Sequence, residues 1–109
     1  DKVVSSMIWG SQYDAMMNWM AKNGKTVGNS NSSNPNNSYT TGSKSTDVVN
    51  NVYDLYGCHR ELTLEACNSC YRAGRGGYLN FYNCPATRNF NITYTAISDG
   101  SSRATLYIE

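Results

Sequence analysis

The chain of 109 residues has few charged side chains, a single histidine and no long apolar run. Charged residues make up 16% of it, and acidic and basic residues are interspersed at a formal net charge of +1. The sequence therefore has no basic stripe that would indicate a nucleic-acid partner and no acidic block that would indicate a charged tail. The longest apolar runs are only a few residues, which predicts no membrane insertion. Nothing at the N-terminus resembles a signal peptide, so export would need a signal further upstream or transport on a larger particle.

Asparagine, serine, threonine, glycine and tyrosine are abundant instead, with nine tyrosines in the chain. This composition is closer to antibody-like recognition surfaces than to a typical cytosolic enzyme. The length predicts a single domain, 1–109, because a chain of this size buries roughly two-thirds of its unfolded surface in one modest core. All four cysteines, the histidine and both phenylalanines lie within 57–96, where the hydrophobic pattern has almost no period. We interpret 57–96 as a variable ligand-binding surface and the rest as its scaffold.

The first quarter of the chain predicts a strand followed by a helix. Val3–Trp9 is an apolar, partly β-branched run that predicts a short strand. Ser11 is the predicted helix cap, with Asp14 as an acidic partner near the helix N-terminus. Lys22 and Asn23-Gly24 are typical of a helix end. Aromatic and methionine side chains on or beside one helical face are predicted to be core: Trp9, Tyr13, Met16, Met17, Trp19 and Met20.

The remainder predicts an α+β fold with an unusual proportion of loop. Residues 25–51 are rich in asparagine and serine and predict a long surface loop. Val52–Gly57 predicts an apolar turn, and Leu62–Glu65 and Ala104–Ile108 alternate as strands do. Arg72–Gly77 predicts a glycine-rich turn or narrow strand where backbones pack closely. Three tyrosines are expected in the core: Tyr53, Tyr56 and Tyr107.

Three segments in the same order resemble signatures of formylglycine-generating-enzyme-like domains. They are YDLYGCHRELT at 53–63, YRAGRGGY at 71–78 and GSSRATLYI at 100–108. The resemblance implies a C-type lectin-like fold, with a twisted antiparallel sheet, a flanking helix and long irregular loops. The chain departs from the family pattern where Cys58-His59-Arg60 replaces Asn-Val-Trp and where Leu62 replaces a second tryptophan.

One branch of this family, the variable proteins of diversity-generating retroelements, fits the chain better than the enzymes do. In that branch asparagine codons of the C-terminal segment are mutagenised. Here Asn80, Asn83, Asn89 and Asn91 are interspersed with Leu79, Phe81, Tyr82, Cys84, Ala86, Phe90 and Ile92, which resembles a partly randomised asparagine-rich template. The fixed frame would consist of Arg75-Gly76-Gly77, Pro85 and Arg88.

The function implied by this resemblance is non-catalytic recognition of a cell-surface protein or glycan. The predicted ligand-binding residues are Cys58, His59, Arg60, Tyr78, Leu79, Asn80, Phe81, Tyr82, Asn83, Ala86, Asn89, Phe90, Asn91 and Ile92. Their aromatic rings supply rigid contact area and their amides supply adaptable hydrogen bonds. Arg60, Arg72 and Arg88 are candidates to bind a carboxylate or stack on a ring. The expected location is extracellular, on a phage virion or a bacterial cell surface, and a homo-oligomer is plausible because avidity strengthens weak single-site binding.

The resemblance also implies a calcium ion but no organic cofactor. Related enzymes bind Ca²⁺ through a segment that matches the carboxylates of Asp54 and Glu61 and the carbonyls of Gly57 and His59. Two carboxylates and two carbonyls on a tight loop suit a hard cation. The alternative is that Asp54 caps a turn and that Glu61 pairs with an arginine.

Other chemistry has less support in the sequence. An oxidase of the formylglycine-generating type needs a cysteine pair, but Phe81 and Ala86 occupy the equivalent positions and Cys84 lies alone between them. A hydrolase is disfavoured because Cys58 and His59 are adjacent, which rarely gives a working dyad. A structural decoration module without a ligand is a further alternative.

The cysteines leave three alternatives open. Cys67-x-x-Cys70 has zinc-ligand spacing, and three other side chains are available to complete a site: Cys58, His59 and Cys84. The other two alternatives are that the cysteines form disulfides or that they remain free thiols.

Overall fold

The computed structural model describes residues 2–25, 40–43, 45, 48–55, 59–76, 88–92 and 100–108. Within these ranges the chain forms one helix and eight short strands, which confirms the α+β prediction. The elements are β1 (Val3–Met7), α1 (Gly10–Lys22), β2 (Val48–Val49), β3 (Val52–Tyr53), β4 (Arg60–Ala66), β5 (Tyr71–Arg75), β6 (Arg88–Ile92), β7 (Gly100–Ser102) and β8 (Ala104–Ile108). No helix among the described residues is long and apolar enough to span a membrane.

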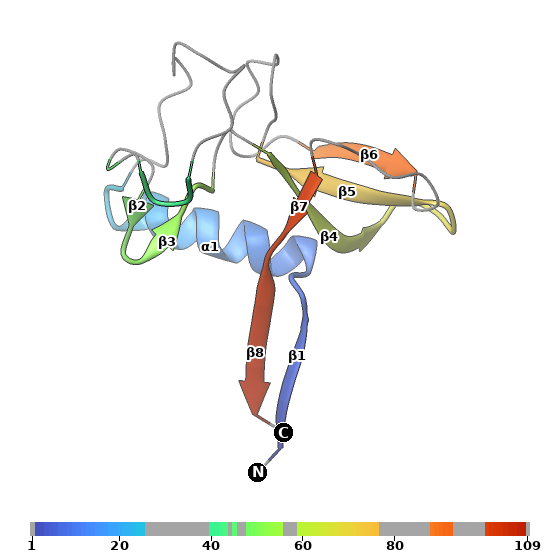
Figure 1. Cartoon of the computed structure of the whole chain (residues 1–109), viewed down its shortest axis with the longest axis horizontal. Coiled ribbons are helices and arrows are strands. Elements are labelled where there is room, and N and C mark those ends of the chain that lie inside the picture. The colour runs from blue at the N-terminus through green and yellow to red at the C-terminus, as the bar shows by residue number, and fades with distance from the viewer. Residues whose placement is uncertain are drawn as a thin grey trace.

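The main sheet has four strands in the order β6-β5-β4-β7, and α1 lies against one of its faces (Figure 1). β4 pairs antiparallel with β5, and β5 with β6. β7 pairs parallel with β4, so the sheet is mixed rather than wholly antiparallel as expected. Between β6 and β7 the chain passes from one edge strand to the other, and this crossing lets β7 run in the direction of β4.

The helix begins two residues earlier than predicted. Trp9, rather than Ser11, is the N-cap, and its backbone N–H donates to the Gln12 side-chain oxygen at 2.8 Å. Asp14 is not a capping partner, because its carboxylate contacts arginines of the sheet. The predicted helix end is confirmed. Gly24 has φ 65°, and Gly24 N and Lys25 N donate to the carbonyls of Ala21 and Met20, the pattern of a Schellman motif.

The core is small and only partly the one predicted. Tyr13 and Met20 are buried together with Ile8, Val49 and Leu55, and Met16 and Met17 pack against this cluster. Trp9 and Trp19, predicted as core, are instead 52% and 45% exposed. Tyr53 and Tyr107 are also exposed rather than buried, because each lies on a two-stranded ribbon that covers little of its surface. Tyr56 lies outside the described residues.

Regular structure resumes earlier in the chain than predicted. β2 and β3 form a hairpin from Val48 to Tyr53, inside the expected 25–51 loop and its following turn. Asn50 and Asn51 connect the strands with φ of 46° and 63°, which is the left-handed pair that a type I′ turn requires. Asparagine tolerates this conformation, so the Asn-Asn pair fits the turn.

The chain ends form a separate two-stranded ribbon. β1 and β8 pair in unbroken register from Val3↔Ile108 to Met7↔Ala104, so the predicted C-terminal strand is confirmed. The ribbon extends away from α1 and the main sheet and places the two termini side by side (Figure 1). Val3, Leu106 and Ile108 on one of its faces are 66–73% exposed.

Candidate functional site

Four strand ends of the main sheet meet at one end of it, which we call the arginine end because Arg60, Arg75 and Arg88 lie there. β4 and β7 begin there at Arg60 and Gly100, which pair with each other. β5 ends there at Arg75 and β6 begins there at Arg88, which also pair. Three stretches of the chain lead into or out of these ends. They are 56–58, through His59; 77–87, through Gly76 and Arg88; and 93–99, through residue 99. Most of the predicted ligand-binding residues are thus joined to the sheet at a single place.

Two arginines at this end bind the same two carboxylates, and we call the four residues Asp14, Glu65, Arg75 and Arg88 the anchor cluster. Arg75 donates to Asp14 Oδ1 at 2.5 Å and to Glu65 Oε2 at 3.5 Å. Arg88 donates to Glu65 Oε1 through Nε at 2.9 Å and contacts Asp14 Oδ2 through Nη2. Because Arg75 and Arg88 flank residues 76–87, the cluster fixes both ends of that connection to helix α1 and strand β4.

Burial and charge differ across the anchor cluster. The Arg75 side chain is 1% exposed, whereas that of Arg88 is 42% exposed. Burial alone would raise the Asp14 pKa, but the hydrogen bonds and charges of Arg75 and Arg88 outweigh it and hold the pKa below its ordinary value. The hydrogen bond to Glu65, together with the two carboxylate charges, outweighs the effect of burial and raises the pKa of Arg88. The ion pairs therefore persist at neutral pH.

A tyrosine from the helix completes the support beneath Arg75. The guanidinium carbon of Arg75 lies 4.6 Å from the Tyr13 ring centroid, within cation–π range. The Tyr13 hydroxyl donates to the Leu55 carbonyl at 2.9 Å, and its burial raises the Tyr13 pKa above the usual range. Gly76 follows at φ 88°, and a Cβ there would lie 2.7 Å from the Leu55 oxygen. The predicted close backbone packing of 72–77 is confirmed at this residue.

The sheet face opposite α1 has a polar surface above Gly74. A Cβ on Gly74 would lie 2.7 Å from Asn91 Nδ2 and 3.0 Å from Arg60 Cδ. Both side chains therefore lie directly over the glycine. Arg60 Nη1 donates to Asn91 Oδ1 at 2.6 Å, and Asn91 Nδ2 donates to the Asn89 carbonyl at 3.1 Å. Asn89 pairs with Gly74, which puts its side chain on the same face. Phe90 points to the other face and is 46% exposed.

The predicted ligand-binding residues therefore divide into three groups. Arg60, Asn89 and Asn91 come together on the face opposite α1, and Phe90 lies on the reverse of the same strand. His59 is half-buried just before β4, and the backbone of Ile92 pairs with Tyr71. Outside the described residues lie Cys58, Tyr78, Leu79, Asn80, Phe81, Tyr82, Asn83 and Ala86. Arg88, considered as a ligand anchor, has its guanidinium on carboxylates of the chain itself.

The predicted calcium ligands do not form a cation site among the described residues. The Glu61 side chain is 8% exposed and accepts from Arg103 through both oxygens, once at 3.0 Å through Nε. Arg103 also donates to the Tyr53 carbonyl at 2.8 Å. Asp54 Oδ2 accepts from Gly42 N at 2.8 Å, while its Oδ1 is buried with no hydrogen-bond partner in the described part of the chain.

Arg103 supplies positive charge where the calcium ion was expected. Burial would lower the Arg103 pKa, but the hydrogen bond and charge of Glu61 outweigh it, aided by the charge of Asp54, and raise the pKa. A calcium ion at Glu61 would have to displace this guanidinium. Gly57 lies outside the described residues, so the calcium ligand set stays a prediction.

The cysteine motif lies at the opposite end of the sheet. Cys67 and Cys70 are exposed free thiols in the turn between β4 and β5. His59 precedes the other end of β4, so about eight residues of mostly extended chain, roughly 20 Å or more, separate it from Cys67. Zinc ligands bind at about 2.0–2.3 Å, so His59 cannot complete a zinc site with this pair. No group of three or more potential metal ligands occurs within the described ranges.

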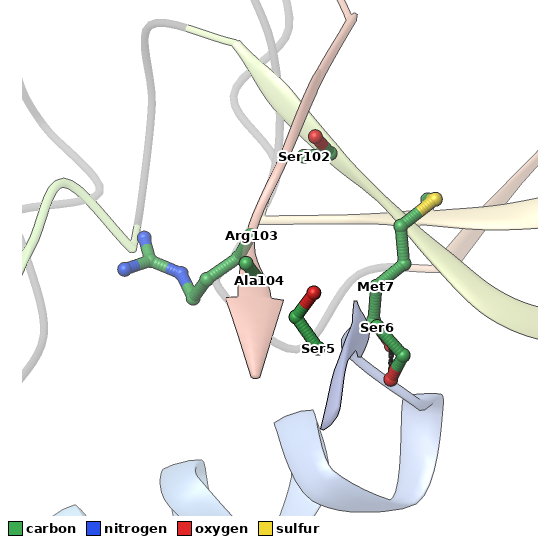
Figure 2. Close-up of a pocket in the computed structure, with 6 residues that line it drawn as sticks. All are labelled: Ser5, Ser6, Met7, Ser102, Arg103 and Ala104. Atoms are coloured by element: carbon green, nitrogen blue, oxygen red, sulfur yellow. Dashed lines mark hydrogen bonds between the residues drawn. The ribbon is translucent and has the colours of Figure 1, made fainter. Parts of the chain in front are cut away.

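A shallow hollow of about 280 Å³ lies beside the β1–β8 ribbon, where β7 leads into β8 (Figure 2). Its lining residues are Ser5, Ser6, Met7, Ser102, Arg103 and Ala104. The Arg103 side chain extends away from the serines in Figure 2, toward its partners Glu61 and Tyr53. The remaining lining groups are small hydroxyls, a methyl and a thioether, which offer no acid, base or metal ligand for catalysis.

Comparisons of the chain with protein-family models, curated proteins and solved structures gave no match.

The two carboxylates of the anchor cluster were not anticipated from the sequence. Arg75 and Arg88 were predicted as fixed frame residues, whereas Asp14 was interpreted as a helix-terminal charge and Glu65 only as part of a strand. The available signal is the scarcity of charge, because a buried arginine in such a chain requires a carboxylate partner. That signal does not say which carboxylate is the partner.

Proposed function

We propose that this chain is a non-catalytic recognition domain that binds a protein or glycan on a cell surface through 77–87 and strand β6. In this proposal the domain has a C-type lectin-like fold and is a variable protein of a diversity-generating retroelement, located on a phage virion or a bacterial cell surface. The observation that supports it best is the anchor cluster. It holds the two strand ends that flank 77–87 on one pair of carboxylates.

Fixing both ends of a binding segment favours recognition. The freedom lost at Arg75 and Arg88 is lost on folding, so it is not lost again when a ligand binds. The anchoring carboxylates belong to α1 and β4, outside the segment 79–92 in which variation is expected. Side chains between the two arginines can then change without removing the contacts that hold the segment in place.

The residues of strand β6 have two different roles in this proposal: some position other side chains, and others contact the ligand. Asn91 uses its amide oxygen on Arg60 and its amide nitrogen on the Asn89 carbonyl, so it positions Arg60 on the sheet face. Phe90 exposes nearly half of a rigid aromatic ring, the kind of side chain that contributes most at recognition surfaces. We therefore assign ligand contact to Phe90 on the α1 face of this edge strand and to Asn89 on its opposite face, and a positioning role to Asn91.

Sequences of sibling genes test the diversified-receptor part of the proposal. Substitutions should concentrate between Leu79 and Ile92, at codons that are asparagine in a near-copy of the 3′ end beside a reverse transcriptase gene. Within β6, Asn89 and Phe90 should vary while the adjacent Arg88 stays constant, because only Arg88 belongs to the anchor cluster. Substitutions spread evenly over the surface, or equally frequent at Arg88, contradict the proposal.

A binding experiment tests the recognition role itself. The probe is an array of bacterial envelope glycans and surface proteins, and the paired variants are Phe90→Ser and Tyr107→Ser. The two residues are similarly exposed, at 46% and 44%, but Tyr107 lies on the β1–β8 ribbon. Phe90→Ser should weaken binding at least about tenfold, as expected for an aromatic hot spot, and Tyr107→Ser should not. Equal effects, or no binding by the parent chain, argue for a decoration module without a ligand.

A further inference from the structure

The turn between β4 and β5 carries two exposed thiols, three positions apart in the chain, at the end of the sheet opposite the arginine end. Cys67 N donates to the Tyr71 carbonyl at 3.2 Å, so the chain reverses direction between these two residues. Cys70 immediately precedes Tyr71. Both cysteines are exposed and free. The recognition role proposed above uses neither of them.

The side chain of Asn68 organises this turn. Its Oδ1 accepts from Cys70 N at 2.9 Å and from Tyr71 N at 3.1 Å. Arg72 Nη1 donates to the Asn68 and Tyr71 carbonyls, both at 3.1 Å, and ties the turn to the strand that follows. The reversal is thus fixed by hydrogen bonds that involve neither sulfur.

The geometry of such a reversal matches the span of a disulfide. The first and fourth Cα atoms of a tight turn lie within about 7 Å of each other. A disulfide joins Cα atoms about 4.4–6.8 Å apart. A Cys67–Cys70 bond is therefore within the reach of a reversal of this length, and it would join two exposed side chains.

We propose that Cys67 and Cys70 form a reversible disulfide by thiol–disulfide exchange with a low-molecular-weight disulfide such as glutathione disulfide. One thiolate of the pair attacks a glutathione sulfur, forms a mixed disulfide and releases one reduced glutathione. The second thiolate then attacks the protein sulfur of the mixed disulfide and releases the other glutathione. The protein dithiol loses two electrons and two protons, and glutathione disulfide gains them as two thiols. The closed form carries a covalent link across the β4–β5 turn.

The sequence allows a direct test, because trypsin cleavage after Arg60 and Arg72 gives a peptide, 61–72, that contains these two cysteines and no others. The native chain is incubated with glutathione disulfide, and remaining thiols are alkylated before digestion and mass spectrometry. We expect peptide 61–72 to lose both alkylation sites, to become lighter by two hydrogens and to stay unlinked to other peptides. Excess reduced glutathione should restore both sites.

Single serine variants supply the matched control. In Cys67→Ser and in Cys70→Ser the second step is blocked, so peptide 61–72 should retain one stable glutathione adduct. Both sites are exposed, and serine differs from cysteine by one atom, so these variants should fold. Two alkylated thiols in the native peptide after oxidation, a persistent glutathione adduct, or a link to the peptides of Cys58 or Cys84 would each overturn the proposal.

Discussion

Arg75 and Arg88 bind the same two carboxylates but differ in burial, so replacing each with methionine separates the effect of burial from that of pairing. Methionine keeps an unbranched side chain of similar length and removes the charge and the donors. Asp14 and Glu65 retain one arginine in either variant. The two substitutions therefore remove ion pairs with the same two carboxylates from environments that are 1% and 42% exposed.

The expected losses differ several-fold. Removing one partner of a buried ion pair costs about 3–5 kcal/mol. Since Asp14 and Glu65 are 39% and 27% exposed and keep Arg88, we expect Arg75→Met to lie at the lower limit, about 3 kcal/mol. Loss of the contact with the Tyr13 ring is included in that figure. Arg88→Met removes pairs that solvent already screens, and should cost about 0.2–1 kcal/mol.

Urea unfolding followed by tryptophan fluorescence measures both variants. A change in midpoint at constant slope reports stability, whereas a change in slope reports altered compactness. About 1 M salt, where the Debye length is about 3 Å, should abolish the Arg88→Met difference and leave most of the Arg75→Met difference. Arg75→Lys serves as a second variant if the methionine form does not fold. A lysine cannot reach both carboxylates as the planar fork does, so an intermediate loss is expected.

Equal losses for Arg75→Met and Arg88→Met would refute the reasoning, because burial would then not decide the energetics of the cluster. A neutral Arg75→Met variant would show that methionine packing replaces the ion pairs in full, as occurs for some buried pairs. In that case the cluster would not anchor the ends of 76–87 through its charges.

Three further predictions concern the buried Tyr13, the glycine at position 76 and the proposed calcium ion. Burial raises the pKa of Tyr13 above its unfolded value, so its contribution to stability is complete below about pH 10 and is lost as pH rises further. Tyr13→Phe should flatten this alkaline decline in urea midpoints, and an unchanged decline would contradict the assignment. Gly76→Ala should destabilise by more than Gly24→Ala, because both have positive φ but only a Gly76 Cβ meets a neighbour, the Leu55 carbonyl; equal thermal shifts would contradict this. The calcium prediction requires that a chelator lower the melting temperature, and unchanged melting would count against a bound ion.

Much of the local structure could be predicted because it depends on neighbouring residues. The helix face of Tyr13 and Met20 follows from its period, and the Gly24 end from the left-handed conformation that glycine allows. The strands at 62–65 and 104–108 follow from alternation, and the structure extends the first to Arg60–Ala66. Close backbone packing near Gly76 follows from the absence of a Cβ.

The errors concern contacts between distant parts of the chain. The pairing of Val3 with Ile108 and the parallel pairing of β4 with β7 depend on the final arrangement of the strands, which no local period encodes. Tyr53 and Tyr107 were expected in the core, but the core has room for few large side chains beyond Tyr13. Asp14 illustrates the same limit, because its position near a helix N-terminus gave a sufficient local explanation for its charge.

The scarcity of charge in the sequence has a structural counterpart in where the described charges lie. Asp14, Glu65, Arg75 and Arg88 hold strand ends in place, and Glu61 with Arg103 joins β4 to the start of β8. Under the proposed function, binding would then be left to Arg60, to uncharged amides and to aromatic rings, and the amides and rings can be exchanged without leaving a buried charge unpaired. Arg88 links the structural role of the charges to ligand binding. Its ion pairs contribute little to stability, but they define where β6 begins. Arg88→Met should therefore reduce ligand affinity far more than it reduces the free energy of unfolding, whereas a substitution at exposed Phe90 should reduce affinity alone.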